Sequence, residues 1–307
     1  MESTQQNISP YHVPALLIES VNLLITNPSG VYVDVTFGGG GHSRKILESL
    51  NAEGRLLAFD RDMDAYANSP DDGRFTFVHS NFRHLENFLK FHKIDKVDGI
   101  LADLGVSFHH FDIPERGFSF RHDAPLDMRM NRDAAVTAAD VIASSDEKQI
   151  LSLFREFADL RNPSAVAKAI TEAKNQKPIE TTTELAQAVA KAIDPRQEKK
   201  ELAQVFQAFR IAANHEIEDL EKFLMATLKV LKSGGRLAVL TYHSVEDRMV
   251  KNFMKTGNPE GKSEKDFYGN ISTPWEIVTR KPIEPSAEEI ERNPRSRSAK
   301  LRVAQLK

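Results

Sequence analysis

The chain has 307 residues, of which 40% are hydrophobic and 28% charged, and its net charge is −3. This length allows one large domain or two ordinary ones, and the absence of cysteine excludes disulfides and thiolate metal sites. The net charge excludes a surface that is basic throughout, so any nucleic acid must bind to local basic patches. No apolar run is long enough to cross a bilayer and no secretory signal pattern is present, so we expect a cytoplasmic protein without a membrane partner.

The first informative motif is a glycine-rich corner. Residues 15–24 have a helical pattern, and residues 31–37 form a β-branched and aromatic run that predicts a buried strand. Four glycines follow, and a second helical pattern continues to about residue 51; the glycines are Gly38, Gly39, Gly40 and Gly41. A flexible turn has the same composition. A strand that turns through glycines into a helix is, however, typical of the nucleotide-binding corner of a doubly wound sheet.

Three more strands are expected before residue 105. Residues 54–60 predict the second strand, which ends on Asp60. This acid lies about twenty residues past the glycines, where an Asp or Glu commonly binds ribose hydroxyls. Residues 74–80 and 97–104 predict the third and fourth strands, with a helix over 84–92 between them. Alternating strands and helices indicate a parallel sheet, and therefore an α/β fold.

The pattern changes to helices after the fourth strand. From about residue 112 to 196 the strand signals stop. Capping boxes predict helix starts at Ser144 and Thr181, and Asn162-Pro163 combines an N-cap residue with a proline suited to the first helical position. This block is typical of an inserted helical domain.

A long helical pattern and further strands complete the chain. The helical pattern covers 199–232 with a break expected near Asn214, and strands are expected at 236–242, 276–281 and 299–306. We therefore predict a sheet domain formed by residues 1–111 and 205–307, and an inserted helical domain for substrate recognition formed by residues 112–204.

Two cofactors compete for the glycine corner. NAD requires the spacing G-x-G-x-x-G, whereas these glycines are contiguous; the first strand carries Asp34 just before them, and Asp60 and Asp103 end the second and fourth strands. Each acid alone has a plain reading as a solvated strand end. Together, three carboxylates would repel a pyrophosphate but suit a cofactor that carries a sulfonium and an ammonium group. The lead into the fifth strand, residues 231–236, is also similar to a feature common in methyltransferases, so we favour S-adenosylmethionine over NAD.

Several longer motifs lie along nearly the whole chain. They are Tyr11-His12-x-Pro14, Asp34-Val35-Thr36-Phe37-Gly38, Gly40-Gly41-His42-Ser43, Asp60-Arg61-Asp62, Asp103-Leu104-Gly105, Arg116-Gly117-Phe118-Ser119-Phe120-Arg121, Pro125-Leu126-Asp127-Met128-Arg129-Met130, Phe206-Gln207-Ala208-Phe209-Arg210-Ile211, His243-Ser244-Val245-Glu246-Asp247-Arg248 and Asn293-Pro294-Arg295-Ser296-Arg297 with Ser298-Ala299-Lys300-Leu301-Arg302. In these motifs and in their order, the chain resembles the bacterial 16S rRNA cytosine-N4 methyltransferase family, whose members methylate a P-site cytosine. The resemblance implies a class I (Rossmann-like) S-adenosylmethionine-dependent methyltransferase sheet with an inserted all-helical domain.

The resemblance also implies which residues contact the cofactor. Asp60 would bind the ribose and Phe82 would lie near the adenine; the full predicted set is Gly38, Gly39, Gly40, Gly41, His42, Asp60, Phe82, Asp103 and His110. His110 stands where the family has a glutamine. A second departure precedes Phe206, where residues 200–204 replace a family segment that ends in arginine.

The same resemblance implies the chemistry and the substrate. Asp103 is the candidate catalytic acid nearest both cofactor and amine, and no metal is needed. The predicted RNA-binding residues are Arg116, Phe118, Phe120, Arg121, Arg129, Arg210, Arg295 and Arg297, chosen as stacking surfaces and phosphate ligands. Each aromatic has an alternative role in packing, and Asp127-Met128-Arg129 has one as an internal ion pair. Ser244-x-x-Asp247 also reads as a helix capping box, which gives His243 a structural role.

The expected function is N4-methylation of a P-site cytosine of 16S rRNA, on the assembled small subunit rather than on free rRNA. The alternatives are a catalytically weakened rRNA-binding protein of the same fold, for which His110 and the missing arginine are the motive, and a methyltransferase for another RNA. The arginines of the insert disfavour a small-molecule substrate. We expect a monomer or a homodimer.

Overall fold

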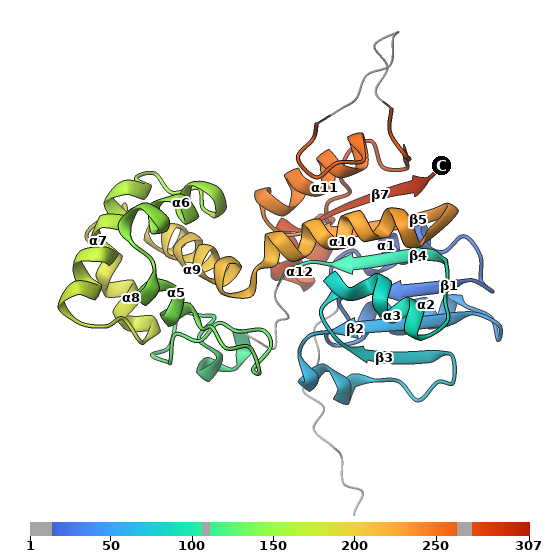
Figure 1. Cartoon of the computed structure of the whole chain (residues 1–307), viewed down its shortest axis with the longest axis horizontal. Helices are drawn as coiled ribbons and strands as arrows, with labels where there is room; N and C mark the ends of the chain where they lie inside the picture. Colours follow the sequence, from blue (N-terminus) through green and yellow to red (C-terminus); the bar gives the residue numbers. More distant parts are fainter. Residues whose placement is uncertain (1–13, 106–110, 263–271) are drawn as a thin grey trace, which may run out of the picture. The chain divides into compact units, whose positions relative to one another are not determined.

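A computed structural model of the chain describes residues 14–105, 111–262 and 272–307 (Figure 1). Two compact units are present: the first comprises 1–105 with 221–307, and the second comprises 106–220. The second unit extends beyond the insert of 112–204 expected from the sequence. The reason is that the helix at its carboxyl end packs on the helices of the insert, so that this helix belongs with them.

The first unit is built on a mixed seven-stranded sheet of order β3-β2-β1-β4-β5-β7-β6. Its first five strands in this order are parallel, and β7 and β6 pair antiparallel at the far edge, as the strand and helix alternation predicted. The strands are β1 Val31–Asp34, β2 Arg55–Asp60, β3 Phe75–His79, β4 Val97–Asp103, β5 Leu231–Thr241, β6 Trp275–Ile277 and β7 Lys300–Leu306. All seven expected strands are therefore confirmed, with ends shifted by a few residues.

The topology decides where ligands bind. The chain runs outward from β1 to β2 and β3, and then returns to place β4 on the other side of β1. The carboxyl ends of β1 and β4 therefore flank the switch point of the sheet, which is where open α/β sheets bind ligands. Asp34, Asp60 and Asp103 are the last residues of β1, β2 and β4.

Helices cover the sheet of the first unit. α2 packs on β2, α1 on β4 and β5, and α11 on the antiparallel strands. These helices bury one face each against strands that are themselves largely buried, as in β4, where six of seven residues are buried. The helices of this unit are α1 Leu17–Leu24, α2 Gly41–Ser49, α3 Leu85–Phe91, α10 Glu216–Val230, α11 Ser244–Thr256 and α12 Ala287–Arg292, and α10 begins within the second unit.

The second unit is helical, as predicted. α9 lies against α5 and α6, and α7 lies against α6 and α8. Phe154 and Phe209 form its centre, with ring centroids 5.5 Å apart and both side chains fully buried. Its helices are α5 Ala138–Ser144, α6 Glu147–Phe157, α7 Pro163–Gln176, α8 Thr182–Val189 and α9 Glu198–Asn214.

The helix starts of this unit test the capping predictions. Thr181 forms a complete capping box with Glu184, and Asn162 caps α7 with a proline at the first turn, so both predictions are confirmed. The prediction for Ser144 is wrong. Ser144 ends α5, and the capping box of α6 is formed by Asp146 and Gln149, because the first residue whose side chain reaches the N3 amide lies two positions later.

The break expected near Asn214 is confirmed. His215 has a φ of 51°, which lies in the left-handed region, and so ends α9 before α10 begins at Glu216. Over the described ranges of the chain, no helix is long and apolar enough to cross a membrane.

Candidate active site

The glycine corner joins β1 to α2. Gly38 and Gly40 have φ values of 51° and 75°, a left-handed conformation that glycine adopts without steric cost. A Cβ on Gly40 would lie 3.0 Å from the Phe37 ring, and a Cβ on Gly41 would lie 2.3 Å from Cγ of Pro14. The corner is therefore a tight cradle that a side chain would fill.

Asp60 closes the cradle from β2. Its Oδ2 accepts a hydrogen bond of 2.8 Å from the Gly38 amide, and its Oδ1 accepts one of 2.8 Å from the Asp62 amide. These two bonds hold the Asp60 carboxylate against the start of the glycine corner. The structure thus brings two predicted cofactor residues, Gly38 and Asp60, into direct contact.

Phe82 lies at the start of the short helix η2, Phe82–His84, and is mostly buried. Its ring forms a T-shaped contact with Phe223 at 5.3 Å, and the Arg61 guanidinium lies 5.7 Å from its centroid. The ring is thus fixed by packing in the first unit. Its predicted contact with adenine stays a prediction.

A buried polar cluster lies beneath the glycine corner. Asp34 is fully buried, and its Oδ2 accepts a 2.7 Å hydrogen bond from the Ser43 hydroxyl. Burial raises the pKa of Asp34, while His42 and Ser43 oppose the rise. Burial likewise lowers the pKa of His42, whose Nε2 lies 3.4 Å from the hydroxyl of Ser20. His42 is therefore held inside the fold beneath the glycines.

Asp103, the predicted catalytic residue, ends β4 next to this cluster. Its amide donates to the Thr36 hydroxyl over 2.6 Å, and its Oδ2 lies 3.6 Å from His42 Nδ1. Burial raises the pKa of Asp103 to about 7; a hydrogen bond from Tyr242 lowers it and the charge of Glu246 raises it. Because 21% of the side chain is exposed, the carboxyl remains accessible to a ligand.

Tyr242 is a residue that the sequence reasoning missed. Its hydroxyl donates a 2.8 Å hydrogen bond to Asp103 Oδ1. The available signal was its position at the end of the predicted fifth strand, where side chains reach the same edge as Asp103. His243, which follows it, accepts from the Glu246 amide and caps α11. Its structural role is thus confirmed, but the cap expected at Ser244 is wrong by one residue.

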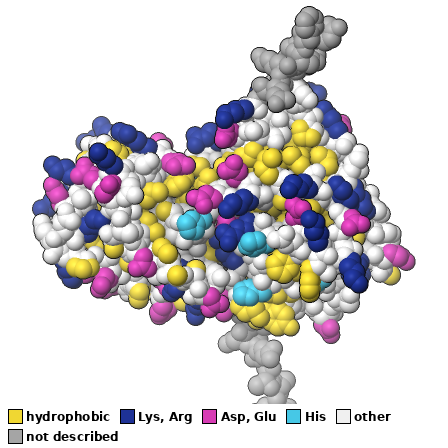
Figure 2. Space-filling view, in the orientation of Figure 1, with side chains coloured by type: hydrophobic (Ala, Val, Ile, Leu, Met, Phe, Trp, Pro, Cys, Tyr) yellow, Lys and Arg dark blue, Asp and Glu magenta, His cyan; other side chains and the backbone are white. Residues whose placement is uncertain are grey.

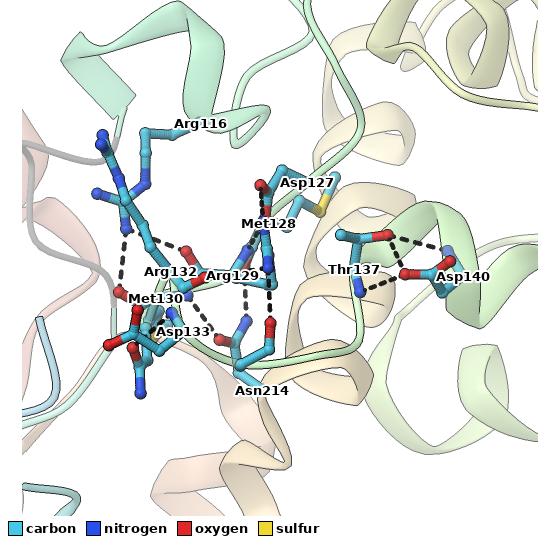
Figure 3. Close-up of polar contacts among 12 residues, drawn as sticks. Arg116, Asp127, Met128, Arg129, Met130, Arg132, Asp133, Thr137, Asp140 and Asn214 are labelled. Carbon is cyan, nitrogen blue, oxygen red and sulfur yellow. Dashed lines mark hydrogen bonds and ion pairs between the residues drawn. The ribbon is translucent and has the colours of Figure 1, made fainter.

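Arg116 and Arg129, both predicted to bind RNA, lie in a closely bonded segment of the second unit (Figure 3). Arg116 is buried, and its Nη2 donates to the backbone oxygens of Arg129 and Met130 at 3.0 Å each. Arg129 forms a two-point ion pair with Asp127, at 2.7 and 2.8 Å, and also donates to two backbone oxygens. The internal ion pair considered for Asp127 and Arg129 is confirmed.

The other predicted RNA residues differ in accessibility. Arg210 pairs with Glu216 at 2.9 and 3.0 Å, and its side chain is only 12% exposed. Phe118 is buried, and Phe120 makes a T-shaped contact with Phe206. By contrast, three guanidinium groups lie on exposed residues: Arg121, Arg295 and Arg297. RNA contact by any of these residues stays a prediction.

Basic residues do not form one continuous field. On the face drawn in Figure 2, Lys and Arg side chains alternate with Asp and Glu side chains, in keeping with the net charge of −3. The predicted cofactor residue His110 lies outside the described residues.

The site has the features expected for binding a cofactor that carries a ribose and two positively charged groups. A glycine cradle, an acid at the end of β2, a buried acid at the end of β1 and a partly exposed acid at the end of β4 meet at the switch point of a parallel sheet. Carboxylates at these places match ribose hydroxyls and the cationic groups of S-adenosylmethionine, whereas they would repel a pyrophosphate. Fold and site thus define an S-adenosylmethionine-dependent methyltransferase of the Rossmann-like class.

Comparison with known proteins agrees with this class. The model of the MraW methylase family matches residues 9–307, and the chain belongs to that family. It is 56% identical over 297 residues to "Ribosomal RNA small subunit methyltransferase H" of Bacteroides thetaiotaomicron, covering 97% of this chain and 98% of that one. It is 52% identical to the protein of that name from Parabacteroides distasonis, covering 98% and 99%.

Solved structures are less similar. An rRNA methylase from Streptococcus thermophilus is 10% identical and has a TM-score of 0.41, with 94% of this chain and 93% of that chain covered.

Proposed function

We propose that this enzyme transfers a methyl group to the N4 amine of a cytosine in the P-site region of 16S rRNA, in the assembled small subunit. The observation that carries the proposal is the partly exposed carboxyl of Asp103 at the carboxyl end of β4, beside the cofactor cradle. The relatives named as small-subunit rRNA methyltransferases support rRNA as the substrate. The choice of cytosine N4 and of the P-site comes from the motif resemblance.

The residues around Asp103 suit this reaction. The exocyclic amine of cytosine is a poor nucleophile, because its lone pair is delocalised into the ring. When bound, S-adenosylmethionine supplies an electrophilic methyl group. Asp103 can accept a hydrogen bond from the amine and hold it in line with that methyl group, and correct placement contributes several kcal/mol to such a step.

Proton balance assigns a second task to Asp103. As the bond from N4 to the methyl carbon forms and the bond from that carbon to sulfur breaks, N4 must lose one proton. Asp103 can accept this proton, since its pKa of about 7 lies near the working pH, where a general base is most effective. No metal ion takes part in this scheme.

Substrate binding requires surfaces for a flipped base and for phosphates. A base in folded RNA must leave its stack before it can reach a carboxyl at a sheet edge. Arg121, Arg295 and Arg297 are exposed and are the first candidates for phosphate contacts, whereas Arg116 is buried, Arg129 and Arg210 are half-buried, and these three hold internal hydrogen bonds. We place the enzyme in the cytoplasm with its ribosomal substrate.

A labelled-methyl transfer assay tests this function. Purified protein is incubated with labelled S-adenosylmethionine and either small subunits or free 16S rRNA that lack the modification, and the methylated nucleoside is identified by mass. We expect N4-methylcytidine, formed on the subunits and lost with Asp103→Ala. Cofactor binding without transfer would instead indicate an rRNA-binding protein. Detection of another methylated nucleoside would support S-adenosylmethionine as the cofactor and refute N4 of cytosine as the methylated group.

A further inference from the structure

Tyr242 stands beside Asp103 on the neighbouring strand end. β4 and β5 are parallel neighbours in which Asp103 pairs with Leu240, and Tyr242 comes directly after β5 ends. Its hydroxyl donates to Asp103 Oδ1 over 2.8 Å. The Tyr242 ring packs against the hydrophobic core of the first unit, and a Cβ on Gly105 would lie in ordinary van der Waals contact with its Cδ2, at 3.5 Å. Packing thus fixes the direction of the hydroxyl.

This contact gives the two carboxyl oxygens of Asp103 different surroundings. Oδ1 accepts from Tyr242, whereas Oδ2 has no hydrogen bond from any residue that the structure describes. The nearest cationic group to Oδ2 is His42 Nδ1 at 3.6 Å, beyond hydrogen-bond distance, and burial lowers the pKa of His42. Oδ2 is therefore the oxygen that can receive a substrate amine.

The charged groups around the pair oppose an ionised Asp103. Asp34 faces it from β1, and Glu246 faces it from α11. The pKa of Tyr242 is raised well above its usual value, first by burial, then by the charge of Asp103 and the hydrogen bond to it, and also by the charges of Glu246 and of Glu289 in α12. Tyr242 therefore remains a protonated donor at any working pH. Among the described neighbours of Asp103, the Tyr242 hydroxyl is the group that stabilises the ionised Asp103 carboxylate by a direct hydrogen bond.

We propose that Tyr242 is a positioning residue for methyl transfer: its hydroxyl holds Asp103 as a carboxylate whose Oδ2 is left for the substrate amine. This inference rests on the proposed function. In the step itself, N4 bonds to the methyl carbon, the bond from that carbon to sulfur breaks with its electrons going to sulfur, and the N4 proton passes to Oδ2. Tyr242 keeps its own proton throughout and acts only through Asp103.

The test is the pH dependence of Tyr242→Phe. This change keeps the ring against Gly105 and removes only the hydrogen bond to the carboxylate. Loss of a hydrogen bond to a charged carboxylate raises its pKa by about 1–2 units. The acidic limb of the kcat/KM profile should therefore move to higher pH by that amount. At pH 7 the rate should fall roughly tenfold and recover near pH 9, because the carboxylate forms again there.

A second variant moves the profile in the opposite direction. Glu246→Gln removes the charge that raises the pKa of Asp103, so its acidic limb should move downward. Tyr66→Phe serves as the matched control, since Tyr66 is 55% exposed on the short helix η1, Met63–Asn68, and its profile should equal that of the unchanged enzyme.

A titration of the protein alone separates this inference from the proposed function. The ¹³C carboxyl signal of Asp103, assigned by its loss in Asp103→Asn, is followed against pH with no RNA present. An upward shift in Tyr242→Phe that matches the shift in the rate profile supports the proposal. An unchanged carboxyl titration or an unchanged rate profile overturns it. If the enzyme makes no N4-methylcytidine, the proposed function fails, while the titration still decides whether Tyr242 holds Asp103 ionised.

Discussion

At the scale of single residues, the site combines groups that would be unfavourable elsewhere in a fold. Asp34 and Asp103 are carboxyls whose pKa values burial raises, and they stand within one cluster beneath the glycine corner. Burying charge without a matching cation costs free energy of folding, so such residues are usually kept for function. The two acids that stand at the candidate site are therefore also residues whose ionised forms reduce stability.

This cost is measurable in Asp103→Asn. The pKa of Asp103 is raised from 3.8 to about 7, so the folded state binds the proton more tightly than the unfolded state. Stability is lost as pH rises from about 4 to 7, and above 7 the loss is at most about 4 kcal/mol. The variant should be inactive, yet more stable than the unchanged protein at pH 8 and equal to it at pH 4, by urea unfolding. Equal stability of Asp103→Asn and the unchanged protein at pH 8 would contradict the raised pKa of Asp103.

At the scale of elements, one asparagine of the second unit bonds the end of α9 to the loop of residues 128–130. Asn214, near the end of α9, accepts from the Met130 amide at 2.8 Å and donates to the backbone oxygen of Met128 at 2.7 Å (Figure 3). Met128 has a φ of 57°, a conformation that is strained for a residue other than glycine. The end of α9 thus fixes the loop that carries Arg129. This contact links the two motifs of residues 125–130 and 206–211.

Asn214→Ala should loosen this loop without touching the cofactor site. Two buried backbone groups would lose their partners, at a cost of about 2–4 kcal/mol for the second unit. Hydrogen exchange of residues 116–134 should rise, while the affinity for S-adenosylhomocysteine, measured by calorimetry, stays within twofold. Asn131→Ala is the matched control, because it removes only an exposed bond to the Asp133 amide. Equal exchange in both variants would refute the role of Asn214.

At the scale of the whole molecule, a net charge of −3 means that RNA affinity must come from local basic groups rather than from the overall field, and exposed arginines are the proposed ones. Removing Arg121, Arg295 or Arg297 should lower the slope of log K against log salt by about 0.7–0.9 each, since one phosphate contact is lost. Binding to small subunits at several salt concentrations measures this slope. Lys90→Ala, which removes an ammonium already paired with Glu86, should leave it unchanged. A slope unaffected by all three arginines would place the RNA surface elsewhere.

The sequence by itself determined the strands, the helical insert and the glycine corner of this protein, because these depend on local periodicity and on residues with special backbone freedom. It also determined that Asp34, Asp60 and Asp103 lie at the carboxyl ends of strands and so share one sheet edge. Only the tertiary structure decided which side chains oppose each other there. The bond from Tyr242 to Asp103 joins residues 139 positions apart, and pairing across parallel strands leaves no local signal. Likewise, only the tertiary structure decided that Arg116 and Arg129 hold the fold internally, because burial is a property of the packed chain.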